Sequence, residues 1–243
     1  MKTLSVAERL IVAADFKPEH GGRKAVRNKV MKLAKSLYGT GVVLKINSAL
    51  RSSGYNLIDS IHDRGLKVMA DLKLNDIKET LATDGALLRE ARPELLTVMC
   101  GTGLDAMKAL KAELPCTEVL GVTVLTNLTE QESLGLYGCS IETAVLRFAH
   151  LAKVAGLDGL VSSAKEVEML RQEFGESFTL NTPAIRPIWA IVPGDDQNPE
   201  RIMTPEKAIK AGADRIVVGR PIILSKKPYD AVMRTLEEIH QAL

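Results

Sequence analysis

Eight short apolar runs recur along the chain, and each is followed by a longer stretch with apolar residues at helical spacing. The runs are rich in Val, Ile and Leu, as expected of parallel strands buried on both faces. They predict strands at residues 10–14, 41–46, 66–71, 95–99, 118–125, 159–162, 178–181 and 215–218. The stretches between them predict helices at residues 25–38, 54–64, 78–91, 104–114, 141–155, 165–173, 205–211 and 229–242.

The number of strand–helix units indicates the fold class. Eight such units in 243 residues, with no Pro/Gly-rich linker between them, predict a (β/α)8 TIM barrel in one domain, residues 1–243. A doubly wound open sheet is the alternative α/β architecture, but it usually has only about five or six strands. The hydrophobic share of 46% is sufficient for one large core.

The net charge argues against a large charged partner. Lys and Arg number 32 against 30 acidic residues, which gives a net charge of +2. A basic cluster lies between Arg23 and Lys35, but Val26, Val30 and Leu33 repeat within it at core-facing spacing. The cluster is therefore interpreted as the solvated face of a helix, and we expect neither nucleic acid nor a membrane surface as partner.

The cysteines and histidines do not form a recognisable metal or disulfide pattern. Cys100, Cys116 and Cys139 lie far apart without a CxxC, and the four histidines lack zinc-site spacing. No uncharged apolar stretch reaches the roughly 18 residues of a transmembrane helix, and the N-terminus does not resemble a secretory signal. We therefore expect a cytoplasmic protein without a protein-bound metal.

Charged residues at the end of the third predicted strand are the first catalytic candidates. Asp71 and Lys73 stand two residues apart, so a regular strand points both to the same side. Buried ion pairs generally cost more to desolvate than they return in stability, which favours a chemical role. Lys45 lies in the neighbouring apolar strand, and the spacing predicts an alternating array of Lys45, Asp71, Lys73 and Asp76. The alternative is that Lys45 extends from the barrel mouth into solvent.

Two arginines after the last two strands predict a phosphate site. Gly219, Arg220 and Pro221 follow the eighth strand, where TIM barrels often bind phosphate. Arg186 lies in the proline-rich segment 182–187 after the seventh strand, so the two guanidinium groups can converge on one dianion. Residues 188–203 lack periodicity and are interpreted as a lid, with Trp189 packed on the barrel rim.

Together these segments resemble the orotidine 5'-phosphate decarboxylase family. The resemblance spans nearly the whole chain and is carried by residues 12–15, 44–45, 71–80, 122–126, 182–187, 196–205 and 218–221. The sequence departs from the common pattern at three positions. Asn75 stands where many bacterial members have His, Lys78 where Pro is usual, and Ala184 where Gly is more familiar.

The resemblance implies that the chain converts orotidine 5'-phosphate (OMP) to UMP and carbon dioxide without metal or coenzyme. Lys73 would protonate the pyrimidine carbon, Asp71 would lie beside the substrate carboxylate, and Lys45 and Asp76 would complete the charged array. A homodimer with shared active sites is also implied, in which Asp76 and Thr80 reach the partner's site. The implied substrate-binding residues are Asp15, Lys45, Thr80, Thr126, Arg186, Gln197, Gly219 and Arg220.

Two other functions are weighed against this one. A magnesium-dependent sugar-phosphate decarboxylase or aldolase on the same barrel would need a carboxylate-rich metal site, whereas the candidate residues here are rich in lysine. A catalytically silent nucleotide-phosphate-binding protein would keep Arg186 and Arg220. Such a protein would have no use for Lys45 and Lys73 in apolar strands.

Overall fold

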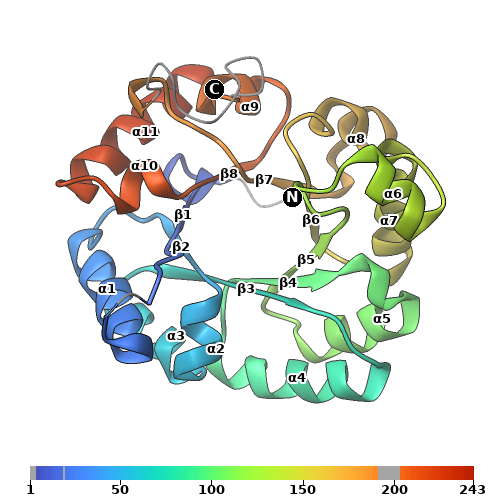
Figure 1. Ribbon diagram of the computed structural model, residues 1–243, viewed down its shortest axis with the longest axis horizontal. Helices are drawn as coiled ribbons and strands as arrows, with labels where there is room; N and C mark the ends of the chain where they lie inside the picture. The colour runs from blue at the N-terminus through green and yellow to red at the C-terminus, as the bar shows by residue number, and fades with distance from the viewer. Residues whose placement is uncertain (1–3, 19, 191–202) are drawn as a thin grey trace.

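Eight parallel strands form a closed barrel in chain order, with the last strand hydrogen-bonded to the first (Figure 1). The computed structural model describes residues 4–18, 20–190 and 203–243. The predicted TIM barrel is confirmed, with each strand within a few residues of its expected place. The strands are β1 Leu10–Ala13, β2 Val43–Ile46, β3 Lys67–Leu74, β4 Leu95–Met99, β5 Glu118–Val122, β6 Gly159–Val161, β7 Thr179–Thr182 and β8 Arg215–Val218.

Helices surround the barrel and cover its outer face (Figure 1). The α-helices in the described ranges are α1 Gly22–Ser36, α2 Ser48–Ser53, α3 Asn56–His62, α4 Lys78–Ala91, α5 Leu104–Glu113, α6 Glu130–Tyr137, α7 Ile141–Ala155, α8 Val167–Phe174, α9 Pro205–Lys210, α10 Arg220–Ile223 and α11 Pro228–Ala242. Short 3-10 turns lie at Ala7–Arg9, Cys100–Thr102, Gly175–Ser177 and Ile188–Ala190. None of these described helices is long and apolar enough to cross a membrane.

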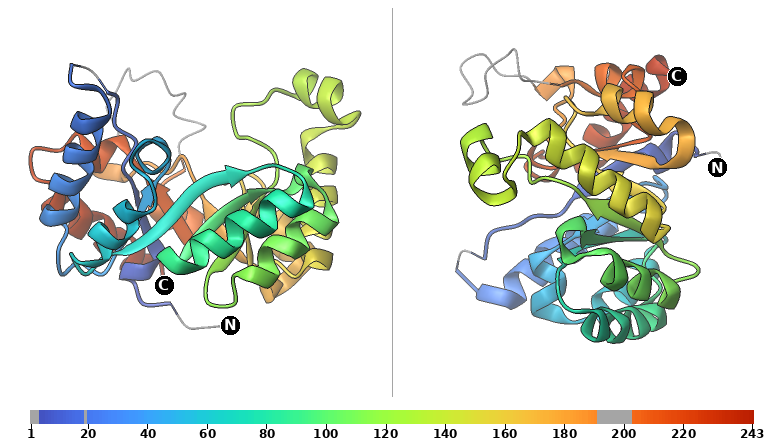
Figure 2. Two further views of the ribbon diagram at one scale, coloured as in Figure 1. Left: turned by 90° about the horizontal axis from the view of Figure 1, so that it is seen from below. Right: turned by 90° about the vertical axis from the view of Figure 1, so that its right-hand side faces the viewer.

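Two of the helices were not predicted from the sequence. Helices α2 and α6 have only 6 and 8 residues, too few to show a clear apolar repeat. Helix α10 has 4 residues and begins beside Pro221, a residue that the sequence offered as a helix start. A local signal was nevertheless present for α6, because Thr129 and Glu132 form a capping box at its start. Helix α6 stands away from the barrel beyond β5 (Figure 2).

The core has two layers because strand residues alternate between the barrel interior and the surrounding helices. The outer layer is the larger one and includes Val26, Val30 and Leu33 of α1. The inner layer consists of Ile11, Ala13, Val43, Met69, Leu95, Leu120 and Val217.

At the amino end of the strands, polar residues replace the apolar layer inside the barrel. Arg215 of β8 donates from Nη2 to Oε2 of Glu118 on β5 at 2.8 Å and from Nη1 to Asn181 of β7. Arg215 is only 5% exposed. The ion pair and the apolar layer lie below the carboxyl ends of the strands, where TIM barrels form their active sites.

Strand β6 requires a glycine where it packs between its two neighbours. A Cβ atom on Gly159 would lie 2.6 Å from the carbonyl oxygen of Thr179 and 2.8 Å from Leu120 Cδ2. We expect Gly159→Ala to lower the free energy of unfolding by about 1–3 kcal/mol, because the barrel must shift to accept the methyl group. Urea denaturation measures this loss.

The matched control is Gly135→Ala in α6, where a Cβ atom meets nothing within 4 Å. This variant should be at least as stable as the unsubstituted protein, since Ala favours a helix by about 0.5–1 kcal/mol over Gly. Equal stability of the two variants would contradict the account of β6 packing.

Candidate active site

A cavity of about 500 Å³ opens at the carboxyl ends of the strands. It brings together eight of the side chains or backbone positions predicted from the sequence. These are Asp15, Lys45, Asp71, Lys73, Thr126, Arg186, Gly219 and Arg220. They come from loops or strand ends of β1, β2, β3, β5, β7 and β8, so residues far apart in sequence meet because the barrel is closed.

Four charged side chains alternate in sign along one wall of the cavity. Lys45 Nζ donates to Asp15 Oδ2 and to Asp71 Oδ2, each at 2.9 Å. Lys73 Nζ donates to Asp71 Oδ1 at 2.6 Å. Lys45 is only 8% exposed, so the interpretation of this lysine as extending into solvent is wrong. Within one chain, Asp15 is the fourth member of the array.

The ion pairs determine the charge states of the two buried groups. Burial by itself would raise the pKa of Asp71, but the charges and hydrogen bonds of Lys45 and Lys73 outweigh it and hold the pKa below its ordinary value. Burial by itself would lower the pKa of Lys45, but Asp71 and Asp15 outweigh it and raise the pKa. Both groups are therefore ionised at neutral pH.

Of the two lysines in this array, Lys73 is the more exposed. Its side chain is 30% exposed, compared with 10% for Lys45. Its ammonium group has one carboxylate contact, whereas Lys45 contacts two. Lys73 can therefore present a proton to a bound molecule while Lys45 remains held between its two acceptors.

The backbone around Lys73 is not a regular strand. Lys73 has a φ of 48°, in the left-handed region that non-glycine residues seldom occupy. The pairing of β3 with β4 shifts at the same point, between Ala70 and Leu74. The prediction that Asp71 and Lys73 lie side by side is confirmed. They meet at an irregular strand end, however, and not through the regular alternation of side chains on which the prediction was based.

An apolar surface completes the inner part of the cavity. It is formed by Met69, Val122, Val124, Val161 and Val217, which lie on four different strands or just after them. Sequence reasoning did not identify these residues as part of a site. The available signal was that alternate residues of each strand point into the barrel. Such a surface suits the face of an uncharged ring next to the charged array.

Another part of the cavity carries the two predicted arginines. Arg186 follows β7 and is 7% exposed, while Arg220 begins α10 directly after Gly219 and is exposed. Ala184, which precedes Arg186, has a φ of 64°. This left-handed conformation explains why glycine would suit the position, and it costs an alanine roughly 1–2 kcal/mol. Both guanidinium groups line the same cavity, as the sequence predicted.

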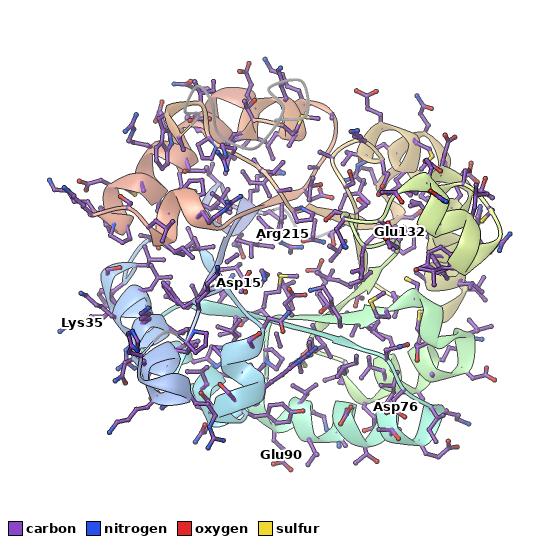
Figure 3. All side chains as sticks on the ribbon, viewed as in Figure 1. Asp15, Lys35, Asp76, Glu90, Glu132 and Arg215 are labelled. Carbon is purple, nitrogen blue, oxygen red and sulfur yellow. The ribbon has the colours of Figure 1, made fainter. Side chains whose placement is uncertain are left out.

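Asp76 and Thr80 lie outside this cavity within a single chain. Figure 3 shows Asp15 near the centre of the barrel and Asp76 beyond the tip of β3, toward α4 and α5. Asp76 is exposed and contacts Thr102, whose hydroxyl donates to the Asp76 carbonyl oxygen at 2.6 Å. Asp76 does not join the array of its own chain, because the irregular end of β3 carries the following residues outward. Its expected place in the partner's site stays a prediction.

The predicted lid lies mostly outside the described residues, and so does Gln197. Trp189, at its start, packs against the core and lies 4.9 Å from the guanidinium of Arg234, measured to the ring centroid. It is not among the cavity-lining residues, so the interpretation of Trp189 as a packing residue is confirmed. In the described ranges, no three His, Cys, Asp or Glu side chains are grouped as a metal site would need.

Comparisons with known proteins agree with this geometry. The sequence model of the "Orotidine 5'-phosphate decarboxylase / HUMPS family" matches residues 8–235. The chain is 36% identical to orotidine 5'-phosphate decarboxylase of Syntrophus aciditrophicus, with 97% of this chain and 94% of the relative covered. It is 37% identical to the Pseudomonas putida (strain GB-1) enzyme of the same name, with 95% and 96% covered.

A solved structure shows the same similarity. The crystal structure of orotidine 5'-phosphate decarboxylase from Lactobacillus acidophilus has a TM-score of 0.79 and 27% sequence identity, covering 96% of this chain and 99% of that chain. The barrel, the cavity and these matches lead to one conclusion. The chain belongs to the orotidine 5'-phosphate decarboxylase / HUMPS family.

Proposed function

We propose that this protein decarboxylates OMP to UMP and carbon dioxide. The observation that carries the proposal is the array Asp15, Lys45, Asp71 and Lys73 in one cavity with Arg186 and Arg220 on another side. The relatives that share nearly the whole chain carry the name of this activity. The array suits the reaction centre, the apolar surface suits the pyrimidine, and the arginines suit the phosphate.

The chemical difficulty is the electron pair left on the ring carbon when carbon dioxide departs. The bond from C6 to the carboxylate breaks, and its electrons remain on C6 of the pyrimidine. Lys73 stabilises this developing charge and transfers a proton from Nζ to C6, after which it regains a proton from solvent. Because Lys73 is already bound to Asp71 at 2.6 Å, its position is fixed before substrate arrives.

Asp71 has two roles in this proposal. It holds Lys73, and it lies where the substrate carboxylate would be seated, so the repulsion between two carboxylates disfavours the bound substrate but not the transition state. Lys45 keeps Asp71 ionised and in place. Asp15 and Lys45 would also contact the ribose, and Thr126 the pyrimidine.

Binding energy at the phosphate offsets the strain at the reaction centre. Arg186 and Arg220 would each offer a planar fork to the dianion, and the backbone of Gly219 would approach it closely. This interaction is equally available to substrate, transition state and UMP, so it provides affinity and positioning. We assign Gln197 to the same end of the substrate.

The proposal includes a reaction without metal or coenzyme, in which the ammonium of Lys73 supplies the positive charge. It also places the protein in the cytoplasm, where the thiols of Cys100, Cys116 and Cys139 would stay reduced. All three are free in this structure, as expected of a reducing compartment.

We further propose a homodimer in which Asp76 and Thr80 complete the partner's site. Support comes from their position outside the cavity of their own chain and from an exposed apolar surface beside them. Ile77, between these two residues, is 66% exposed, and Leu87 of α4 is 50% exposed. Exposed apolar side chains next to functional residues favour a protein contact at this place.

The first test is the loss of orotate absorbance when the purified protein is mixed with OMP and excess chelator. We expect full turnover by the unsubstituted protein, and for Lys73→Ala a fall in kcat of at least about a thousandfold, since both the cation and the proton donor are lost. The Kd for UMP should stay measurable. Lys108→Ala, at an exposed position of α5, is the control and should retain full activity. A kcat of Lys73→Ala close to that of the unsubstituted protein would refute its role.

Arg220→Ala tests the phosphate site. We expect the Kd for UMP to rise roughly 10–150-fold, because a charged hydrogen-bonding group contributes about 1.5–3 kcal/mol. The Kd for uridine, which has no phosphate, should be unchanged. Isothermal titration with both ligands measures the two effects, and an equal loss for uridine would show that Arg220 does not act through the phosphate.

Mixed dimers test the shared site. Lys73→Ala and Asp76→Ala should each be inactive, but in a mixed dimer one site carries both substitutions and the other carries neither. Random mixing after refolding should restore about a quarter of the unsubstituted activity. No recovery, with mixed dimers confirmed by sedimentation and mass spectrometry, would mean that Asp76 does not serve the partner's site.

A further inference from the structure

Thr97 contacts both residues to which the proposed chemistry is assigned. It lies in the middle of β4, is 0% exposed, and does not line the cavity. Its Oγ1 accepts a hydrogen bond from the backbone N of Lys73 at 2.9 Å and donates one to Asp71 Oδ1 at 3.0 Å. A hydroxyl has a single proton, so this proton is fully committed to the Asp71 carboxylate.

The contact with Lys73 lies where the two strands lose their regular register. Ala70 pairs with Leu96 and Leu74 pairs with Val98, so four steps along β3 correspond to two steps along β4. Such an insertion removes backbone groups from the regular ladder, and buried backbone groups need another partner. The hydroxyl of Thr97 supplies a partner for Lys73, the residue with the unfavourable left-handed φ.

The contact with Asp71 fixes the rotation of its carboxylate. Oδ1 accepts from Thr97 and from Lys73 Nζ, and Oδ2 accepts from Lys45 Nζ. With Thr97 bound to Oδ1, that oxygen faces Lys73 and Oδ2 faces Lys45. Without the hydroxyl, the carboxylate could rotate and the Lys73 ammonium could follow it.

We infer that Thr97 is a positioning residue for the proposed decarboxylation. Thr97 holds the irregular end of β3 and thereby directs the Lys73 ammonium toward the substrate. The inference rests on the proposed function and adds a residue that does not touch substrate. Thr97 acts through its hydroxyl, which makes both hydrogen bonds, whereas Leu95, two residues earlier on the same strand, belongs to the inner apolar layer. A residue that only filled the barrel would not need the polar group.

The experiment compares substitutions that remove or retain the hydroxyl. Thr97→Val removes the hydroxyl and keeps the shape of the side chain, and Thr97→Ala removes the hydroxyl and some volume. Thr97→Ser retains the hydroxyl. The control is Thr235→Val in α11, where a buried hydroxyl donates to the Ala231 carbonyl and does not line the cavity. Each variant is characterised by kcat and KM for OMP, by Kd for UMP and by urea denaturation.

We expect Thr97→Val to lower kcat by about 10–100-fold, since displacing a reacting group by about 1 Å can cost a hundredfold. The Kd for UMP should change by less than about threefold, because the phosphate site is intact. Thr97→Ser should remain within about threefold of the unsubstituted kcat, and Thr235→Val should be unchanged. If Thr97→Val does not fold, Thr97→Ala must show the loss of kcat.

Two results would overturn the inference. One is unsubstituted kcat in a folded hydroxyl-free variant, and the other is an equal loss of kcat in Thr97→Ser and Thr97→Val, which would indicate packing. If the unsubstituted protein does not turn over OMP, the proposed function fails separately. In that case, crystal structures of the unsubstituted protein and Thr97→Val test whether Thr97 positions Lys73. The inference requires the φ of Lys73 or its contact with Asp71 to differ between them, and identical geometry would overturn it.

Discussion

A carboxylate buried in a barrel is costly to ionise, and Asp71 stays ionised because two lysines and a threonine hydroxyl surround it. Removing either lysine would leave an unbalanced charge in a place that water reaches poorly. The same condition keeps Lys45 charged between two carboxylates. The whole site is thus one electrostatic unit, and its members cannot be exchanged one at a time without disturbing the others.

The barrel makes this unit possible. Asp15, Lys45 and Asp71 follow or end three consecutive strands, and the parallel pairing of β1, β2 and β3 places those ends side by side. The surrounding apolar residues strengthen each interaction by excluding water. Because the barrel is closed, the arginines that follow β7 and β8 line the same cavity as the charged array. The barrel therefore fixes the distance between the array and the two arginines.

Much of this arrangement could be read from the sequence because burial leaves a strong pattern. Eight apolar runs gave the barrel, and lysines inside such runs gave Lys45 and Lys73. The distance of Asp76 from the array of its own chain could not be predicted, because regular alternation does not extend through the irregular end of β3. Thr97 was not noticed, since threonine is common in strands and its sequence position does not reveal a partner on β3. Short helices such as α2 leave too few residues for a periodic signal.

The inner apolar layer has a consequence for how the two ends of the barrel can be altered. It lies between the cavity at the carboxyl ends of the strands and the ion pair of Arg215 with Glu118 at their amino ends. Two groups of buried charges are thus kept apart inside one barrel. Because distant sites contribute almost independently to stability, substitutions at the amino end can change how firmly the barrel holds together while the charges around Asp71 stay as they are.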